Sequence, residues 1–168
     1  MTLIEFSDYQ CPFCAQHFRE TLQQIQRDYI STAKVKYVFR DFPIVSENRE
    51  AFKAAEAARC AGEQSKYWEM HDRLFATQKV GPKDVTSHAQ ALRLDLGKFQ
   101  RCVDSGQQAM KIHKDLADGQ KAGIKGTPTF FLGFTEPKES KIKILKVIEG
   151  AQEFAIFRQA IDSLLSQK

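Results

Sequence analysis

The spacing of apolar positions along the chain changes twice, and each change marks a change in predicted secondary structure. Leu3-Ile4-Glu5-Phe6 is a short run rich in strand-forming residues. After it, apolar residues recur every three or four positions, as on one face of an amphipathic helix. These residues are Cys14, Phe18, Leu22, Ile25 and Tyr29. The segment 34–39 then alternates up to Asp41-Phe42-Pro43, which predicts a second strand closing a β-α-β unit.

From about Ser46 to residue 119 the sequence shows helical periodicity only. The stripes that predict helices run from Glu47 to Ala61, from Tyr67 to Phe75, from Val85 to Leu92, from Leu96 to Val103 with Asp95 as the cap, and from Ala109 to Leu116. This block is expected to form an all-helical subdomain.

Strand-forming residues return after Gly126-Thr127-Pro128. Thr129 to Leu132 and Ile142 to Ile148 predict a hairpin with a polar turn at Glu136 to Ser140, and a last amphipathic helix follows from Phe154 to Leu165. The predicted fold is therefore α/β, with the order β-α-β, helical block, β-β-α. We assign residues 1–45 and 120–168 to one discontinuous domain and residues 46–119 to a helical insertion.

Composition and charge narrow the function classes. The 168 residues suit one domain, and the net charge of +4 is spread among interspersed acids and bases. One basic cluster, formed by Lys138, Lys141, Lys143 and Lys146, falls on the predicted hairpin. There it is better explained as a charged strand edge that resists aggregation than as a nucleic-acid site.

The apolar runs of the sequence show neither a membrane span nor an export signal. No run reaches the roughly 18 apolar residues of a transmembrane helix, and no basic-then-apolar leader is visible. Because the first strand begins directly after Met1, we expect the chain to be the mature part of a longer secreted or membrane-anchored precursor.

Cys11-Pro12-Phe13-Cys14 lies where the first predicted strand ends and the first helix begins. Cys11 falls at about the N-cap, and Pro12 at the first helical position, where its missing N–H costs nothing. The helix dipole and unpaired N–H groups favour a thiolate at Cys11, so its pKa is expected below the ~8.5 of a free cysteine. Cys14 begins the apolar stripe and is expected to be buried. One reactive and one shielded sulfur make a redox couple.

Half of a zinc site has the same C-x-x-C spacing and is the alternative interpretation. Zinc requires a second close pair of ligands. The remaining candidates are scattered: His17, His71, His88 and His113, with Cys60 and Cys102 42 residues apart. A redox motif beside a β-α-β pattern is therefore favoured, with no metal and no cofactor beyond the redox-active disulfide.

A second feature is Gly126-Thr127-Pro128-Thr129, directly before a strand. An ordinary trans turn is the first expectation, since only about 5–6% of X-Pro bonds are cis in folded proteins. A cis Pro128 would hold an extended backbone edge beside the cysteines, ready to pair with a peptide. Together with the C-x-x-C pair, the cis form is favoured.

Five segments, in chain order, carry a family resemblance: Leu3 to Cys14, Arg40-Asp41-Phe42-Pro43, Ala57-Ala58-Arg59-Cys60-Ala61, Tyr67-Trp68-Glu69-Met70-His71-Asp72, and Gly126-Thr127-Pro128-Thr129-Phe130-Phe131. On these segments, which span nearly the whole chain, it resembles the DsbA-like branch of the thioredoxin superfamily. These are thiol-disulfide oxidoreductases that oxidise secreted proteins. The resemblance implies a thioredoxin fold with the helical block inserted.

The resemblance also implies roles for individual residues. Cys11 corresponds to the nucleophile and Cys14 to its resolving partner. Thr127 and Pro128 correspond to the loop that receives substrate backbone, with Pro12 and Phe13 completing the substrate-binding surface. The best-known family motif has Pro-His between the cysteines, whereas this chain has Pro-Phe. The pKa of Cys11 is therefore expected to be lowered, but by less than in a protein with the Pro-His motif.

Three further residues are interpreted one by one, and for Glu5 and His17 an alternative stays open. Glu5 matches a buried acid that shuttles protons to the second cysteine, and the alternative is a partly exposed strand residue paired with a lysine. His17 is expected to face solvent at the edge of the first helix, although it could modulate the thiolate. Trp68 is expected to pack in the core of the helical block.

The resemblance further implies a structural disulfide between Cys60 and Cys102, as some relatives have such a pair. Two buried free thiols are the alternative, since cysteine packs well as a small hydrophobe. A bridge would close a loop of about 43 residues, worth roughly 4 kcal/mol in the chain-entropy model. It would also indicate an oxidising compartment.

The implied function is that of an extracytoplasmic protein dithiol oxidase, acting as a monomer in the periplasm or a similar compartment, or anchored to a membrane by a segment outside this chain. Its expected substrates are unfolded or reduced secreted proteins, and its expected reoxidant is a membrane quinone-linked protein of DsbB or vitamin K epoxide reductase type. A nucleic-acid partner is not expected. The alternatives are a disulfide reductase or isomerase, and a non-catalytic thioredoxin-like interaction domain such as one fused to a transporter.

Overall fold

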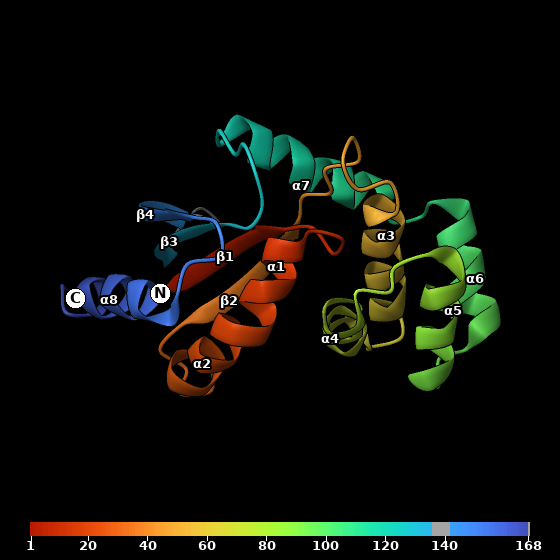
Figure 1. The fold of residues 1–168 in the computed structure, drawn as a ribbon, viewed down its shortest axis with the longest axis horizontal. Coiled ribbons are helices and arrows are strands. Elements are labelled where there is room, and N and C mark those ends of the chain that lie inside the picture. The colour runs from red at the N-terminus through yellow and green to blue at the C-terminus, as the bar shows by residue number, and fades with distance from the viewer. Residues whose placement is uncertain (136–141, 168) are drawn as a thin grey trace.

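A four-stranded sheet, in the order β2–β1–β3–β4, lies at one end of the molecule (Figure 1). β1 (Thr2–Ser7) runs parallel to β2 (Lys36–Asp41). β3 (Thr129–Thr135) runs antiparallel to β1, and β4 (Ile142–Glu149) antiparallel to β3. The strand order and directions confirm the predicted β-α-β and β-β-α units.

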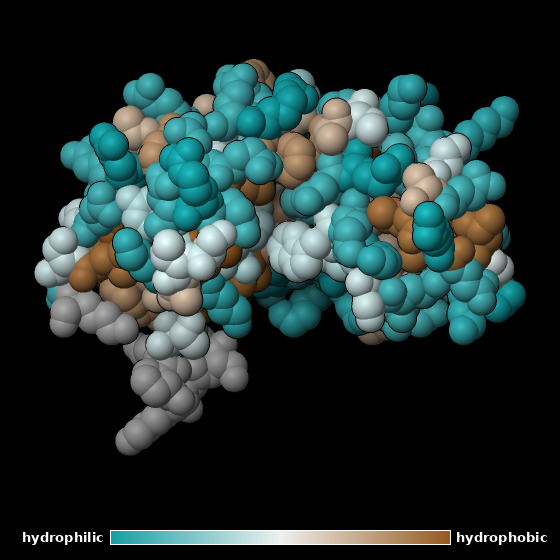
Figure 2. Space-filling view, turned by 90° about the horizontal axis from the view of Figure 1, so that it is seen from below, coloured by the Kyte–Doolittle hydropathy of each residue, from teal (hydrophilic) through white to brown (hydrophobic). Residues whose placement is uncertain are grey.

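The computed structural model describes residues 1–135 and 142–167. The predicted turn at Glu136 to Ser140, and with it Lys138 and Lys141 of the basic cluster, lies outside the described residues. Among the described helices, none is long and apolar enough to cross a membrane. The face shown in Figure 2 is mainly hydrophilic, with apolar residues in small separate patches.

The helix after β1 runs without a break from residue 12 to residue 30. α1 (Pro12–His17) and α2 (Gln23–Ile25) are α-helical, and the stretches 18–22 and 26–30 are π-helical. This helix contributes to two hydrophobic clusters: Cys14 packs with the helical block, while Ile25 packs with the sheet and the last helix. It therefore buries a wider surface than the single apolar stripe predicted.

Helices fill the middle of the chain, as predicted. They are α3 (Ala51–Gly62), α4 (Tyr67–Thr77), α5 (Pro82–Ala91), α6 (Leu96–Ser105) and α7 (Ala109–Lys121). The predicted cap of α6 is confirmed, because the Asp95 carboxylate accepts a hydrogen bond from the Lys98 N–H at 2.9 Å. Figure 1 shows α3 to α6 gathered at the end away from the sheet, with α7 running back to it.

The start of α3 was predicted four residues too early, at Glu47 instead of Ala51. Side chains from the loop after β1 hold this segment in turns. The Asp8 carboxylate accepts a hydrogen bond from Asn48 at 2.8 Å, and the Gln10 amide oxygen accepts one from the Glu50 N–H at 3.0 Å. These contacts replace the first helical turn.

Both faces of the sheet are covered by helices. On one face Leu3, Phe130 and Leu132 pack against α8 (Phe154–Leu165). On the other face Phe6 and Phe131 form a cluster with Phe42, and Leu116 of α7 packs against it. Because side chains alternate along a strand, Glu5 shares the face of Leu3, beneath the first helix.

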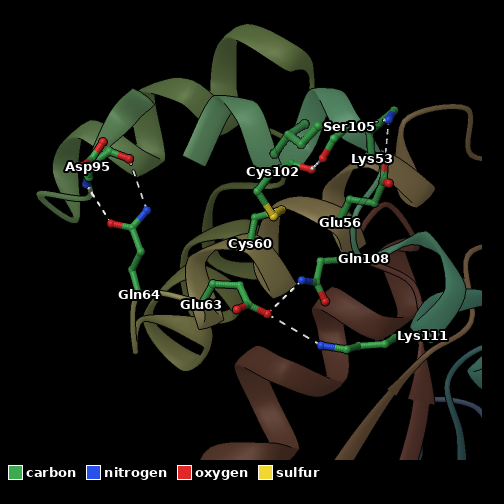
Figure 3. Close-up of a disulfide and its surroundings, with 11 residues drawn as sticks. Lys53, Glu56, Cys60, Glu63, Gln64, Asp95, Cys102, Ser105, Gln108 and Lys111 are labelled. Carbon is green, nitrogen blue, oxygen red and sulfur yellow. Dashed lines mark hydrogen bonds and ion pairs between the residues drawn. A yellow bond between two sulfur atoms is a disulfide. The ribbon is translucent and has the colours of Figure 1, made fainter. Parts of the chain in front are cut away.

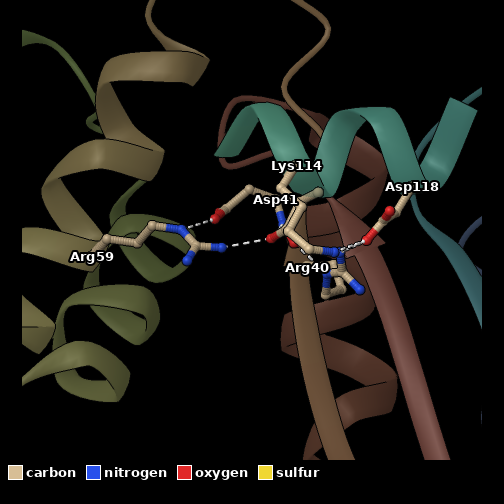
Figure 4. A network of polar contacts seen from close by, with 6 residues as sticks. Arg40, Asp41, Arg59, Lys114 and Asp118 are labelled. Atoms are coloured by element: carbon tan, nitrogen blue, oxygen red, sulfur yellow. Dashed lines mark hydrogen bonds and ion pairs between the residues drawn. The ribbon is translucent and has the colours of Figure 1, made fainter. Parts of the chain in front are cut away.

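A network of charges ties α3 and α7 to β2 (Figure 4). Arg59 of α3 donates hydrogen bonds to Asp41 at 2.6 Å and to Asp115 of α7 at 2.5 Å. Arg40 donates to Asp115 and, at 2.6 Å, to Asp118. Asp115 thus accepts from two arginines on different elements, so each charge in this network has an opposite charge at hydrogen-bond distance.

Candidate redox-active site

The first cysteine of the C-x-x-C pair lies at the N-terminus of the first helix. Cys11 has an extended backbone and is the N-cap of α1, and Pro12 is the first helical residue. The Cys11 carbonyl accepts the first intrahelical bond, from Ala15 at 3.1 Å. Phe13, between the cysteines, is 61% exposed. This geometry is the one predicted from the strand-to-helix change in the sequence.

The two sulfurs differ in environment. Cys14 is fully buried, whereas Cys11 retains 7% exposure, which is less than its expected role as the accessible thiol suggested. A hydrogen bond from the Cys14 thiol, with help from the backbone N–H groups of Cys14 and Phe13, lowers the pKa of Cys11 to about 6. Burial raises the pKa of Cys14 well above its ordinary value. At neutral pH the pair therefore holds its negative charge on Cys11.

The loop that precedes β3 closes over Cys11. The Cys11 Sγ lies 3.4 Å from the Thr127 carbonyl oxygen, and the Thr127–Pro128 peptide bond is cis. The loop is held on both sides, since the Pro128 carbonyl accepts from the Gly150 N–H at 2.8 Å and the Thr129 hydroxyl donates to Gly126 at 2.7 Å. Residues 116 positions apart in the sequence thus meet at one sulfur.

Glu5 lies under the cysteines and is 2% exposed, so the alternative of a partly exposed residue paired with a lysine is wrong. Its Oε2 accepts a hydrogen bond from the Tyr37 hydroxyl at 2.6 Å. Burial is the main cause that raises the pKa of Glu5 to about 7, and the negative charge of Cys11 adds to it. Glu5 can therefore change its protonation state near neutral pH.

The prediction that His17 faces solvent is wrong. The ring is 1% exposed and its Nε2 lies 3.5 Å from Glu5 Oε2. It packs against Phe130 and Phe157, with ring centroids 4.4 and 5.2 Å away. Burial lowers the pKa of His17 to about 3, so the ring is neutral. The signal for its position was its spacing of three residues from the buried Cys14, which puts both on one helix face.

Asp8 is a site residue that the sequence interpretation missed. Its carboxylate accepts hydrogen bonds from the N–H of Gln10 at 2.7 Å, the N–H of Ile44 at 2.9 Å and the Asn48 amide. The Asp8 carbonyl accepts from the Cys11 N–H at 3.1 Å. Asp8 thereby fixes the loop before Cys11 to the segment that follows β2. Its position three residues before Cys11 carried no signal of these contacts.

Cys60 and Cys102 form a disulfide that joins α3 to α6, as the family resemblance implied (Figure 3). The bond lies among polar contacts of the helical block, such as that between Gln64 and Asp95. Cys11 and Cys14 are free. Among residues 1–135 and 142–167, no group of three His, Cys, Asp or Glu side chains lies close enough together to hold a metal ion.

Trp68 does not pack in the core of the helical block, contrary to its prediction. Its side chain is 46% exposed and its ring lies 5.8 Å from that of Tyr37, measured between centroids. Both rings line a groove between the first helix, β2 and α4. Trp68 therefore contacts the sheet side of the molecule, at the junction with the helical block.

Comparison with known proteins agrees with this geometry. The thioredoxin family model matches residues 1–162. The crystal structure of α-DsbA1 from Wolbachia pipientis is 26% identical, with a TM-score of 0.84 over 99% of this chain and 86% of that one. The probable disulfide bond formation protein D of Bacillus anthracis is 24% identical over 138 residues, 77% of this chain and 64% of that protein.

A further group of relatives is named Na⁺/H⁺ antiporter NhaA. NhaA 3 of Salinispora tropica is 37% identical over 133 residues, which are 79% of this chain and 20% of that protein. This chain therefore spans about a fifth of the length of those relatives. The family model matches nearly the whole chain and the fold is shared with DsbA proteins, so the chain belongs to the thioredoxin family and has the DsbA-like form of its fold.

Proposed function

We propose that the chain is an extracytoplasmic dithiol oxidase that introduces disulfides into secreted proteins through the Cys11–Cys14 couple. The observation that carries the proposal is the contrast between the two sulfurs: the pKa of Cys11 is lowered to about 6 while that of Cys14 is raised. Whatever stabilises the Cys11 thiolate stabilises the reduced enzyme, so electrons flow from substrate to enzyme.

The reaction begins with the oxidised couple. A substrate thiolate attacks the Cys11 sulfur, the Cys11–Cys14 bond breaks, and Cys14 leaves as a thiolate. A second substrate thiolate then attacks the substrate sulfur of the mixed disulfide and releases Cys11. The substrate has lost two electrons and gained a disulfide, and the enzyme has gained both electrons. Cys11 is a good leaving group because its low pKa stabilises the released thiolate.

Glu5 is the proposed proton donor to the departing Cys14 sulfur. Burial destabilises the Cys14 thiolate and raises its pKa, so the thiolate takes up a proton as soon as it forms. With a pKa of about 7, Glu5 is protonated in a substantial fraction of molecules at neutral pH. It is the buried acid on the face of β1 beneath the pair, and neutral His17 beside it adds no positive charge.

The substrate is proposed to bind along the Thr127–Pro128 loop. The Thr127 carbonyl lies 3.4 Å from the Cys11 sulfur, directly before the start of β3, so a peptide that pairs with the backbone of this loop is brought next to the sulfur. Phe13 offers an exposed aromatic surface in the same helix start as Cys11, next to Pro12. Contacts of this kind recognise unfolded chains without regard to their sequence.

The Cys60–Cys102 disulfide supports an oxidising compartment for this chain. The relatives named Na⁺/H⁺ antiporters, in which the matching segment makes up a fifth of the length, support attachment to a membrane. We therefore propose that the chain acts outside the cytoplasm, on reduced secreted proteins, and is reoxidised by a membrane quinone-linked protein.

The equilibrium of the Cys11–Cys14 couple with glutathione tests the direction of electron flow. An oxidase requires a potential well above roughly −200 mV, whereas a reductase lies near −270 mV. The Cys60–Cys102 pair must stay oxidised during the titration, which mass mapping of alkylated peptides checks. A potential in the reductase range would exclude the oxidase and favour the reductase alternative.

Catalysis itself is tested by oxidation of a reduced two-cysteine peptide, compared between the unmodified chain and Cys11→Ser. The unmodified chain should oxidise one equivalent of peptide in a burst, and Cys11→Ser none. Absence of a burst from the unmodified chain would support the non-catalytic interaction domain instead.

A further inference from the structure

A groove of about 470 Å³ lies beside the buried acid site, between the first helix, β2 and α4. One part of its lining is aromatic, from Phe18, Tyr37, Trp68 and His71. The rest is polar, from Gln23, Gln26 and Asp72, and aliphatic, from Leu22 and Ile30. A groove of this size and polarity admits water.

Tyr37 belongs both to this groove and to the acid site. Its ring lines the groove beside Trp68, while its hydroxyl donates to Glu5 Oε2 at 2.6 Å. The side chain therefore stands between the groove and a carboxyl group that is 2% exposed. The groups that face Glu5 are Tyr37 of β2, neutral His17 of α1, Ser7 at the end of β1 and Cys11 at the start of α1.

We propose that Tyr37 is a positioning residue for proton transfer at Glu5: its hydroxyl holds the ionised carboxylate, and its ring keeps water in the groove away from it. The inference rests on the proposed function, in which Glu5 gives one proton to the Cys14 thiolate. The proton returns to Glu5 when the couple is reoxidised and the Cys14 thiol becomes a thiolate again. Tyr37 stays neutral throughout, because burial and the nearby Glu5 carboxylate raise its pKa well above the ordinary value.

The two contributions of Tyr37 act in opposite directions, so two variants separate them. Tyr37→Phe keeps the ring but removes the donor that stabilises the carboxylate, and the titration midpoint of Glu5 should rise by about one pH unit. Tyr37→Ala opens the groove to Glu5. Burial is the largest cause of the raised pKa of Glu5, so entering water should lower the midpoint despite the lost hydrogen bond.

The midpoint is measured by infrared difference spectroscopy of the reduced protein, which reports the C=O stretch of a protonated carboxyl group. The spectrum of Glu5→Gln assigns the Glu5 band. Trp68→Phe is the matched control, because it changes the same groove, keeps an aromatic ring beside Tyr37 and has no contact to Glu5, and its midpoint should equal that of the unmodified chain. Shifts of the same sign in Tyr37→Phe and Tyr37→Ala, or a shift in Trp68→Phe, would overturn the inference.

A third variant covers the case in which Tyr37→Ala does not fold. Site-specific incorporation of 3-fluorotyrosine at position 37 keeps the ring and makes the hydroxyl a stronger donor, so the Glu5 midpoint should fall; an unchanged midpoint refutes the inference. The infrared readout uses no substrate. If the midpoints shift as expected while peptide oxidation keeps its pH profile, the role of Glu5 in the proposed function fails and the positioning by Tyr37 stands.

Discussion

The alkylation rate of Cys11 in the reduced protein should stop rising with pH well below the range in which ordinary thiols ionise. Its pKa is lowered from 9.0 to about 6. At pH 7 about nine-tenths of Cys11 is then thiolate, against about one-hundredth for a thiol with the ordinary pKa. The thiolate population rises about ninetyfold through this shift.

The gain in rate is smaller than the gain in thiolate. Nucleophilicity falls with pKa, with a Brønsted coefficient of about 0.4–0.5, so a shift of this size makes each thiolate roughly twentyfold less reactive. The two effects leave Cys11 only about fourfold faster than an ordinary thiol at pH 7. The shape of the pH profile, and not the absolute rate, is therefore the diagnostic quantity.

The assay is alkylation with iodoacetamide at a series of pH values, followed by mass mapping of the modified peptides. Cys11 should follow a single titration with a midpoint near pH 6 and a plateau above pH 7, and Cys14 should stay unmodified. Cys14→Ala should move the midpoint upward, because the hydrogen bond from Cys14 is the largest cause of the lowered pKa. Cys14→Ser, which keeps a donor, should move it less.

A rate that climbs tenfold per pH unit between pH 7 and pH 8.5 would show that Cys11 has an ordinary pKa and refute the reasoning. Preferential labelling of Cys14 would reverse the roles of the two sulfurs. Midpoints in Cys14→Ala and Cys14→Ser that both equal the midpoint of the unmodified chain would show that Cys14 does not stabilise the thiolate.

Three other outcomes are expected. Phe13→His should lower the midpoint of Cys11 and make the couple more oxidising in the glutathione titration, because a histidine there adds positive charge beside the thiolate; an unchanged potential would contradict this. The pKa of Glu5 is raised from 4.5 to about 7 on folding, so its contribution to stability is present at low pH and lost as pH rises through 7. The free energy of unfolding of Glu5→Gln, measured with denaturant, should therefore rise by about 3 kcal/mol relative to that of the unmodified chain between pH 4 and pH 8. A constant difference between the two would count against burial as the cause of the raised pKa. Cys60→Ala should lower the free energy of unfolding by about 2–5 kcal/mol and leave peptide oxidation intact, with loss of oxidation as the contrary result.

Local patterns in the sequence are sufficient to predict the strands, most helices and the placement of Cys11 and Cys14 at the start of the first helix. The reactive position of Cys11 depends on a strand end, a proline and a helix start, all within a few residues. The contact of Cys11 with Thr127 was implied by family resemblance, since neighbouring residues hold no information about a partner 116 positions away. The burial of Glu5 was implied in the same way.

The errors concern residues whose surroundings come from several distant elements. His17 was assigned to solvent because a single apolar stripe defined the buried face, but the first helix packs against both the sheet and the helical block. Trp68 was assigned to the helical core, yet its neighbour is Tyr37 of β2. In both cases tertiary packing, and not helical periodicity, decided which side chains are covered.

The charge network on β2 has a topological consequence. Two helices of the helical block are bound to neighbouring residues of β2. Arg59, in the first of these helices, donates to Asp41, and Asp115, in the last, accepts from Arg40 and from Arg59. A segment whose ends are pinned side by side closes on itself, and its length has little effect on the cost of closure. The stretch between these anchors can therefore change in length at little cost to the closure of the segment, provided that the helices packed against the cysteines are kept.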